Sequence, residues 1–465
     1  MSASQKLFCV VSLIFLLLSA CTPPTLAVTG TPRPGVTEDA SVPVTPTRAV
    51  SSLGVRKEAL RGAQVTVWHP WFGAEASLFE SQVAQFNKLN EWGIVVSTEG
   101  KENFGELYQQ TTDALEDENN PHLVIAFPEY ALGWQKNVVD LNIYLHDPEY
   151  GLTVLEMSDF ATAVWAQDEV EGIRYGLPAQ RTARFLLYNE SWARELGFLS
   201  PPRTSTEFET QSCAAHAALG KDGDPNNDAL GGWIIDPNAY TALSWMLAFG
   251  GGIQEEQGYR FLAPGNVEAF KYLKALQQKS CAWVPSPDLP VNERFAMRQA
   301  LFTTAGLEDL PEQERAFLTS GNHDEWTMLT FPGPQREALV IYGSSFVMFQ
   351  SEDVTQLATW LFMRWMLAPE NQARWVQSTG LFPLRSATLN LLGDYSAAHP
   401  QWAEAAKLLS EGESTPQLPS WRSVRVMLGD GFADMFDAIR HPDLTDGQVP
   451  VVLKQMEDIA AELNQ

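Results

Sequence analysis

Apolar and polar positions alternate regularly over the first part of the folded chain. Residues 64–68 (QVTVW) have the composition of a strand, and Phe79, Val83 and Phe86 recur at the i, i+4, i+7 spacing that places three apolar side chains on one helix face. The pattern predicts strands at 64–68, 94–96 and 123–127 and helices at 77–90 and 104–117. This strand–helix alternation predicts a parallel sheet with helices on both faces, whose ligands bind beyond the carboxyl ends of the strands.

The stretch 172–192 links this unit to a second one. It opens with a turn, has its path fixed at Pro178, and continues as the apolar strand Phe185–Tyr188 before a helix that is expected after Asn189. Because α/β patterns lie on both sides, we interpret the stretch as a hinge crossing of a two-lobed ligand-binding protein.

The second unit shows the same kinds of pattern. Thr204 or Ser205 is expected to cap a helix that contains Cys213. Further helices are predicted at 240–249, 267–279, 357–367 and 371–378, and strands at 327–331, 338–342 and 346–349. The predicted fold class is therefore α/β, with two lobes that are each a mainly parallel sheet flanked by helices and a cleft between them.

The N-terminus has the pattern of an export signal. Lys6 precedes the apolar run 7–18, which is shorter than the about 20 residues of a membrane-spanning helix. Leu18–Cys21 resembles a bacterial lipobox, so we expect residues 1–20 to be a signal peptide and Cys21 to be lipidated; an ordinary cleaved signal is the alternative. Residues 21–61, rich in Thr and Pro in their first part, are expected to form a disordered tether.

Composition limits the cellular compartments and the binding partners that are compatible with this chain. The net charge of −26 argues against nucleic acid or anionic lipid as partner, and no later segment has the length and apolarity of a membrane span. The expected location is therefore the extracytoplasmic face of the cell membrane, with the lipid as the only anchor. In that oxidising compartment Cys213 and Cys281 are predicted to form a disulfide, with two buried free thiols as the alternative.

Motifs for catalysis, metals and cofactors are missing from the sequence. The seven His residues have no ligand spacing, and there is no nucleophile elbow, phosphate loop or dinucleotide fingerprint, so we predict no metal, no cofactor and no enzyme activity. Acidic residues alternate over 222–228, but Asn227 and Trp233 stand where a calcium loop needs Gly and Glu. A solvated turn is the favoured interpretation.

Aromatic residues are the remaining signal. Several of the fifteen Trp lie at predicted strand ends and turns, where a ring can cover the apolar face of a sugar while neighbouring polar groups pair with its hydroxyls. The alternative for each of them is core packing, which we expect for the helical Trp245, Trp360, Trp365 and Trp375.

An ordered set of short motifs resembles the bacterial extracellular solute-binding proteins of family 1, which are similar to maltose-binding protein. The set is Val65–His69, Val83–Asn87, Pro121–Ile125, Tyr175–Pro178, Leu187–Asn189, Pro201–Thr204, Phe331–Gly333 and Gly343–Phe346. The resemblance implies a periplasmic-binding-protein-like fold with residues 62–180 and 338–380 in lobe I, residues 181–337 and 381–465 in lobe II, and crossings near 178–183, 332–338 and 380–385. It further implies a monomer that delivers a carbohydrate to the permease of an ABC importer with its ATPase.

The resemblance also places ligand-facing residues. They are Trp71, Phe72, Glu75, Phe127, Glu129 and Tyr130 on the first lobe and Asp236, Asn238, Tyr240 and Trp421 on the second. The loop 306–308 has no aromatic ring here, unlike that of the maltose binder. At the floor of the cleft Arg181 is expected to meet the ligand, with a salt-bridged face as its alternative.

Two other functions remain compatible with the sequence. A secreted hydrolase of glycans would use the same aromatic lining, although no residue pair is suited to the chemistry. A binder of a charged small solute, such as a polyamine or peptide, would suit the acid excess.

Overall fold

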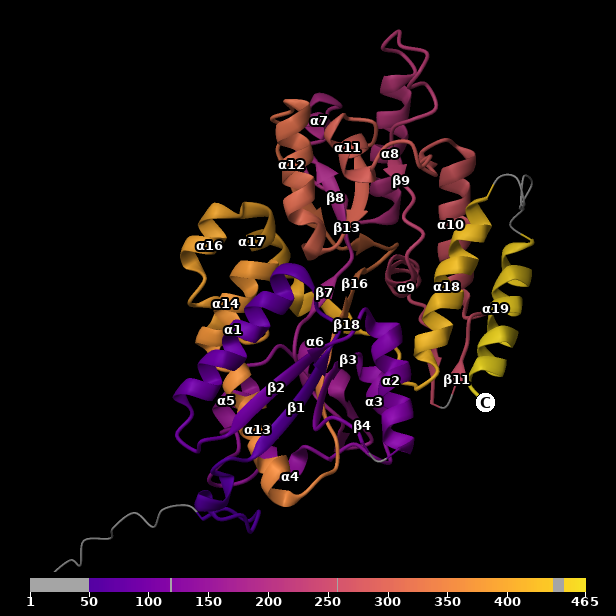
Figure 1. Ribbon diagram of the computed structural model, residues 1–465. Helices are drawn as coiled ribbons and strands as arrows, with labels where there is room; N and C mark the ends of the chain where they lie inside the picture. The colour runs from indigo at the N-terminus through magenta and orange to yellow at the C-terminus, as the bar shows by residue number, and fades with distance from the viewer. Residues whose placement is uncertain (1–49, 118, 257, 438–446) are drawn as a thin grey trace, which may run out of the picture. The chain divides into compact units, whose positions relative to one another are not determined.

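Two five-stranded sheets organise the computed structural model, which describes residues 50–117, 119–256, 258–437 and 447–465 (Figure 1). The first has the order β2-β1-β3-β17-β6 and contains β1 (Gln64–His69), β2 (Val95–Gly100), β3 (Leu123–Ala126), β6 (Leu177–Pro178) and β17 (Ser345–Met348). The second has the order β12-β9-β13-β8-β14 and contains β8 (Phe185–Asn189), β9 (Trp233–Ile234), β12 (Ala282–Trp283), β13 (Phe302–Ala305) and β14 (Trp326–Leu329). The predicted two-lobed α/β fold is confirmed.

Each sheet has one strand that runs against the others. In the first sheet β2, β1 and β3 are mutually parallel and β17 is antiparallel to both of its neighbours. In the second sheet β8 is antiparallel to both β13 and β14. Both reversed strands come directly after a crossing from the other sheet. The other strands of each sheet run toward the side where the two lobes meet. A strand that directly follows a crossing starts on that side and runs away from it. The antiparallel direction of β8 and β17 therefore marks the two places where the chain crosses between lobes.

Helices surround both sheets. With the first sheet lie α1 (Gly73–Leu89), α2 (Phe104–Glu116), α3 (Pro128–Gly133), α4 (Asn142–Leu145), α5 (Val154–Ser158), α6 (Thr162–Trp165), α13 (Asp353–Met366), α14 (Pro369–Thr379) and α15 (Ser386–Leu389). With the second lie α7 (Glu190–Glu195), α8 (Ser205–Leu219), α9 (Ala239–Ala248), α10 (Pro264–Gln278), α11 (Val291–Ala296), α12 (Leu310–Ser320), α18 (Trp421–Phe436) and α19 (Val449–Leu463). The predicted cap is confirmed, because the Thr204 hydroxyl accepts from the Glu207 amide at the start of α8.

A third, small sheet joins the crossing segments. It contains β7 (Thr182–Ala183), β15 (Phe331–Pro332), β16 (Glu337–Tyr342) and β18 (Gly412–Ser414). β7 on the first crossing pairs antiparallel with β16 on the second, with Ile341 opposite Ala183. A third connection leaves α14 and reaches α16 (Gly393–Ala398) and α17 (Pro400–Lys407), and the Phe382 amide on it donates to the Arg181 carbonyl. The three connections are therefore hydrogen-bonded to one another. The remaining strands are the short pairs β4 (Glu169–Val170) with β5 (Ile173–Arg174) and β10 (Gln254–Glu255) with β11 (Gly258–Tyr259).

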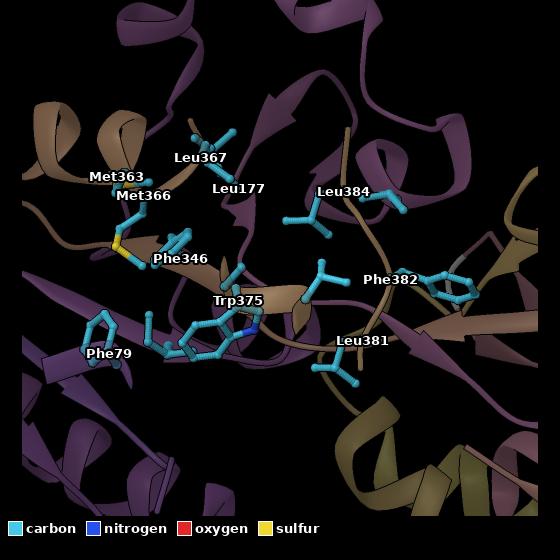
Figure 2. Packing of buried hydrophobic residues seen from close by; sticks show 14 of the residues in the cluster. Phe79, Leu177, Phe346, Met363, Met366, Leu367, Trp375, Leu381, Phe382 and Leu384 are labelled. Atoms are coloured by element: carbon cyan, nitrogen blue, oxygen red, sulfur yellow. The ribbon is translucent and has the colours of Figure 1, made fainter. Parts of the chain in front are cut away.

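The third connection is fixed by apolar side chains. Leu381, Phe382 and Leu384 are all buried, and Figure 2 shows them beside Trp375 in the cluster that contains Phe79 of α1. Burying a side chain of this size stabilises a fold by about 1.5–3 kcal/mol. The connection is thus part of the core and not a loose loop.

The folded part begins earlier than expected. The Ser51 and Ser52 hydroxyls and the Ser52 amide donate to the Asp147 carboxylate, and Leu60 is fully buried. Contacts with the folded part thus begin before residue 61, where we predicted the end of the tether, and Leu60 is the apolar residue that anchors this segment. The signal peptide 1–20, Cys21 and the first part of the tether lie outside the described residues. Within the described ranges, no helix combines the length and the apolarity needed to cross a membrane.

Candidate functional site

Two segments that follow parallel strands form the first wall of the site. β1 is followed by Trp71 and Phe72 before α1, and β3 is followed by Phe127 before α3. Phe127 stacks on Phe104 with ring centroids 4.2 Å apart and meets the edge of Tyr130 at 5.6 Å. The carboxyl ends of neighbouring parallel strands meet at one edge of a sheet, which is why these distant segments lie together.

Glu129 is a buried acid on this wall. It is 4% exposed, and its Oε1 atom has no hydrogen-bond partner among the described residues. Burial raises the pKa of Glu129, and the nearby guanidinium of Arg425 opposes that shift. Burial also raises the pKa of Tyr130 to about 12, with Glu129 contributing. An acceptor that is desolvated and unpaired costs free energy unless a ligand supplies a donor.

Arg425 reaches this wall from the other lobe. It lies on α18, with its guanidinium 5.3 Å from the ring centroid of Phe127 and 5.6 Å from that of Tyr240. One turn earlier on the same helix, Arg422 lies 4.3 Å from the ring centroid of Tyr108 on α2. Two guanidinium groups of the second lobe therefore lie against aromatic rings of the first lobe, and Arg425 also lies against Tyr240 of its own lobe.

A pair of parallel tyrosine rings forms the second wall. Tyr240 at the start of α9 and Tyr342 at the end of β16 stack with centroids 3.7 Å apart and an interplanar angle of 6°. Burial raises the pKa of both phenols, so both hydroxyls stay protonated and remain donors at neutral pH. The Tyr342 hydroxyl lies 3.3 Å from Glu308 Oε1.

Carboxylates from both lobes approach each other beside these rings. Glu308, on the loop after β13, accepts a hydrogen bond of 2.8 Å from the Thr182 hydroxyl. Its pKa is raised by burial and then by Asp309. Burial and the charge of Glu308 raise the pKa of Glu75 on α1. The charge of Glu308 on the second lobe thus acts on the predicted Glu75.

Asp236 belongs to an ion-pair network at the end of β9. Its Oδ2 accepts from Arg184 Nη2 at 2.9 Å and from the Thr241 hydroxyl at 2.6 Å, and Arg184 Nη1 also contacts Asp309 at 3.0 Å. The neighbouring Asn238 caps α9 by accepting from the Tyr240 amide. Asp236 is therefore engaged in a salt bridge, and the Asn238 side chain is engaged in capping the helix.

Three predicted residues do not face the cleft. Arg181 has no exposed side chain, forms a 2.8 Å ion pair with Asp168, and donates to the Ser344 carbonyl. Trp421 is 0% exposed within the core of the second lobe. Trp71 packs against Trp375 with centroids 4.6 Å apart and is 5% exposed. In this structure a salt bridge holds Arg181, and packing in the core holds the two Trp rings.

Phe72 differs from its neighbour Trp71. Its side chain is 78% exposed although it precedes α1 directly. Its exposure leaves a large ring in solvent near Glu75. Phe72 is therefore available to a ligand or partner, whereas Trp71 is not.

Sequence reasoning missed Tyr342, Arg422 and Arg425. Tyr342 directly precedes Gly343, so it lies at a strand end, which was the available signal. The two arginines are three residues apart on one helix face, directly after the Trp421 that was chosen instead. Arg425 lies four residues after Trp421 and so shares its side of the helix, but its longer side chain reaches the rings of Phe127 and Tyr240 while Trp421 is buried in the core.

Two further motifs of the sequence are the cysteine pair and the acidic loop at 222–228. Cys213 and Cys281 form a disulfide that joins α8 to the edge strand β12, which confirms that prediction. In the 222–228 loop the Asp224 amide and the Asn227 side-chain amide both donate to Asp222, so its oxygens close a turn. The described residues contain no cluster of His, Cys, Asp and Glu arranged to hold a metal ion.

Comparisons with known proteins agree with this arrangement. The family described as "Bacterial extracellular solute-binding protein" matches residues 81–408. A putative binding protein of Brucella abortus is 23% identical over 282 residues, which cover 59% of this chain and 66% of the relative, slightly less than two thirds of its length. The sugar-binding protein MalE of Xanthomonas citri superposes with a TM-score of 0.73 at 20% identity, covering 86% of this chain and 97% of that one.

A second solved structure shows the same fold. It is the cyclic alpha-maltosyl-1,6-maltose binding protein of Arthrobacter globiformis, with a TM-score of 0.70 at 16% identity over 87% of this chain and 99% of that one. The chain belongs to the family of bacterial extracellular solute-binding proteins.

Proposed function

We propose that this protein captures a carbohydrate between its lobes and delivers it to the permease of an ABC importer. The supporting observation is the lining of the cleft, in which the stacked Tyr240 and Tyr342 adjoin Glu308, while Glu129 and Arg425 approach from opposite lobes. Rings cover the apolar face of a pyranose, and charged groups pair with its hydroxyls. Two similar structures are sugar-binding proteins by name, in agreement with this proposal.

Lobe closure is the proposed mode of capture. A ligand that touches both walls binds the closed state better than the open one and shifts the population toward closure by that difference in affinity. The hydrogen-bonded crossings β7 and β16 are the proposed hinge, with residues 62–180 and 338–380 moving as one lobe and 181–337 and 381–465 as the other. Ligand binding thus favours the closed conformation, which the permease can recognise.

Membrane attachment is a further part of the proposal. Residues 1–20 are removed as a signal peptide, and lipid on Cys21 holds the monomer at the extracytoplasmic face of the membrane. Metabolic labelling with a palmitate analogue tests this point. Wild type should incorporate the label and Cys21→Ala should not, and equal labelling of both would contradict lipidation at Cys21.

A thermal-shift screen of the purified protein tests the function. Mono- and oligosaccharides are compared with polyamines and short peptides, since a ligand that binds only the folded state at 100 times its Kd adds about 2.7 kcal/mol of stability. Stabilisation by sugars is the expected result. Stabilisation by amines or peptides alone would contradict the carbohydrate proposal.

A ring substitution connects the response to the site. Tyr342→Ala is expected to weaken binding of the stabilising sugar about two- to tenfold, because it removes one stacking ring. The matched control is Tyr395→Ala, which removes a tyrosine that packs on Trp402 in the α16–α17 region. Equal affinities of the two variants would contradict a role for Tyr342.

A further inference from the structure

The turn between α4 and α5 holds the start of the folded chain. Asp147 Oδ2 accepts hydrogen bonds of 2.9 Å from the Ser51 hydroxyl and 2.8 Å from the Ser52 amide, while its Oδ1 accepts from two amides of the turn itself. One buried carboxylate therefore fixes both the turn and the point at which residues 22–49 join the folded part. Figure 1 shows this start, in indigo, at the end of the first lobe that is away from the second lobe.

Three large apolar side chains are exposed around this turn. Val154 and Leu155 in the first turn of α5 are 79% and 78% exposed, and Ile143 on α4 is 52% exposed. The Leu152 amide donates to the Leu145 carbonyl, which joins the two segments two residues from Val154 on one side and two residues from Ile143 on the other. We call Ile143, Val154 and Leu155 the α4–α5 patch.

The helix α5 keeps its apolar side chains in solvent. None of its residues is buried, and a capping box between Thr153 and Glu156 fixes its start. Val154 and Leu155 are therefore positioned by local hydrogen bonds and not by packing against the core. Single exposed apolar residues are common, but a group of them that is held in place marks an interaction surface.

The length of chain before Ser51 identifies what can reach this patch. With lipid on Cys21, as proposed, residues 22–49 are the chain between the membrane and the Asp147 turn. A flexible chain of about 28 residues has an end-to-end distance of about 30 Å, which gives the patch an effective concentration of about a millimolar relative to the bilayer. A contact too weak to form in free solution is populated under that condition.

Charge beside the attachment point suits phosphate headgroups. The segment 53–62 contains three basic residues and one acid, although the whole chain has a net charge of −26. Lys57 pairs with Glu91, whereas Arg56 and Arg61 are exposed cations. Guanidinium groups bind phosphate oxygens readily. The start of the folded part thus combines apolar and basic side chains, and a phospholipid surface binds both.

We infer that the α4–α5 patch docks on the phospholipid surface of the membrane, so that the first lobe is the one that faces the bilayer. The inference rests on the proposed lipidation of Cys21 and adds an orientation to it. The lipid brings the chain to the membrane, and the three apolar side chains of the patch then enter the headgroup region. The protein is thereby held in one orientation and does not rotate freely on its tether.

Hydroxyl-radical footprinting of the intact lipidated protein on phosphatidylcholine vesicles tests the inference. Oxidation of each side chain is compared with that in Cys21→Ala protein mixed with the same vesicles, and flotation shows which protein is attached. The three residues of the patch should be oxidised about threefold less in the attached protein, because the headgroup region excludes solvent from them. Leu199 and Leu318 on the second lobe are 92% and 77% exposed, so they serve as internal controls and should be oxidised equally in both proteins.

A double variant separates docking from mere nearness to the anchor. Val154→Ser combined with Leu155→Ser replaces two exposed apolar side chains, so folding stability and the thermal-shift response to solute should not change. On vesicles Ile143 should then lose its protection from oxidation. The matched pair Leu199→Ser and Leu318→Ser should leave Ile143 protected.

Three outcomes would overturn the docking. Wild type that floats with the vesicles while its patch is oxidised as fast as in Cys21→Ala would overturn it and leave lipidation and solute capture standing. Wild type that does not float would overturn lipidation and docking together. Protection of the patch that Cys21→Ala shares, and that grows with protein concentration, would show contact between copies of the chain instead.

Discussion

Two arginines show how the same side chain serves different purposes in one molecule. Arg181 is fully buried and pairs with Asp168, whereas Arg425 lies between rings of both lobes and has no salt-bridge partner among the described residues. Their residue type and local sequence do not distinguish them. What differs is the element that packs beside each, and this explains why Arg181 was predicted for the ligand and Arg425 was not.

The buried pair should contribute to folding and not to binding. Asp168→Asn leaves the Arg181 charge without its counter-ion, and breaking such a pair costs about 3–5 kcal/mol of unfolding free energy. Urea denaturation measures this loss, and titration of the folded protein should show an unchanged ligand affinity. An exposed pair provides the control: Glu91→Gln breaks the pair with Lys57, in which both side chains are exposed, and should cost no more than about 1 kcal/mol. Equal losses in the two variants would contradict the structural role.

Glu129 should make stability depend on pH. Burial raises its pKa, so in the window between the ordinary and the raised pKa the folded state holds a proton that the unfolded chain has released. Stability therefore falls as pH rises through this window. Glu129→Gln removes the penalty, so it should flatten the profile and raise the urea midpoint at neutral pH.

The control for this titration has the opposite sign. A hydrogen bond from the Arg203 amide lowers the pKa of Glu207 in the capping box of α8. Glu207 therefore contributes stability that is lost as pH falls through its lowered pKa, and Glu207→Gln should lower the midpoint at neutral pH. A Glu129→Gln profile that parallels wild type would contradict the assignment.

At the scale of elements, the positions of most helices and strands along the chain could be predicted from the sequence. Which elements lie beside one another in space could not. Apolar periodicity placed β1, α2, β3, β8 and β16 within a few residues of their observed bounds. Periodicity is a local property, and a helix face or strand face follows from it directly. Which strand lies beside which, such as β17 between β3 and β6, depends on contacts between residues more than 150 positions apart.

The disulfide ties two such distant elements together. Replacing Cys213 and Cys281 by Ala releases a loop with a sequence separation of 68, which should cost about 4 kcal/mol in the chain-entropy account. Urea unfolding with and without a reducing agent measures this effect. Reducing agent should destabilise the wild type to the level of the double variant and leave that variant unchanged. A reductant effect on the double variant would point to a different origin.

For the whole molecule, the proposed hinge requires a close approach between two crossing segments. Gly343 has φ of +152°, and a Cβ there would lie 2.2 Å from the Gln180 carbonyl oxygen on the first crossing. Gly343→Ala should therefore force the crossings apart, lowering the unfolding free energy by about 2 kcal/mol and weakening ligand-induced closure. Denaturation and small-angle scattering with and without ligand measure the two effects.

A second glycine provides the comparison. Gly393 begins α16, and a Cβ there meets no atom within 4 Å. Gly393→Ala should be neutral or slightly stabilising, because Ala is the better helix former. If both substitutions were equally harmless, the close approach at Gly343 would not constrain the hinge.

The sequence by itself determined the fold class, the main elements and the segments that carry the candidate site, because periodicity, turn residues and motif order are local. It also placed Glu129, Tyr240 and Asp236 on segments that line the site. Only the tertiary structure decided which faces of those segments meet, burying Trp71, Trp421 and Arg181 while bringing Tyr342 and Arg425 to the cleft. A side chain's exposure depends on elements that pack against it from elsewhere in the chain, and no local pattern records them.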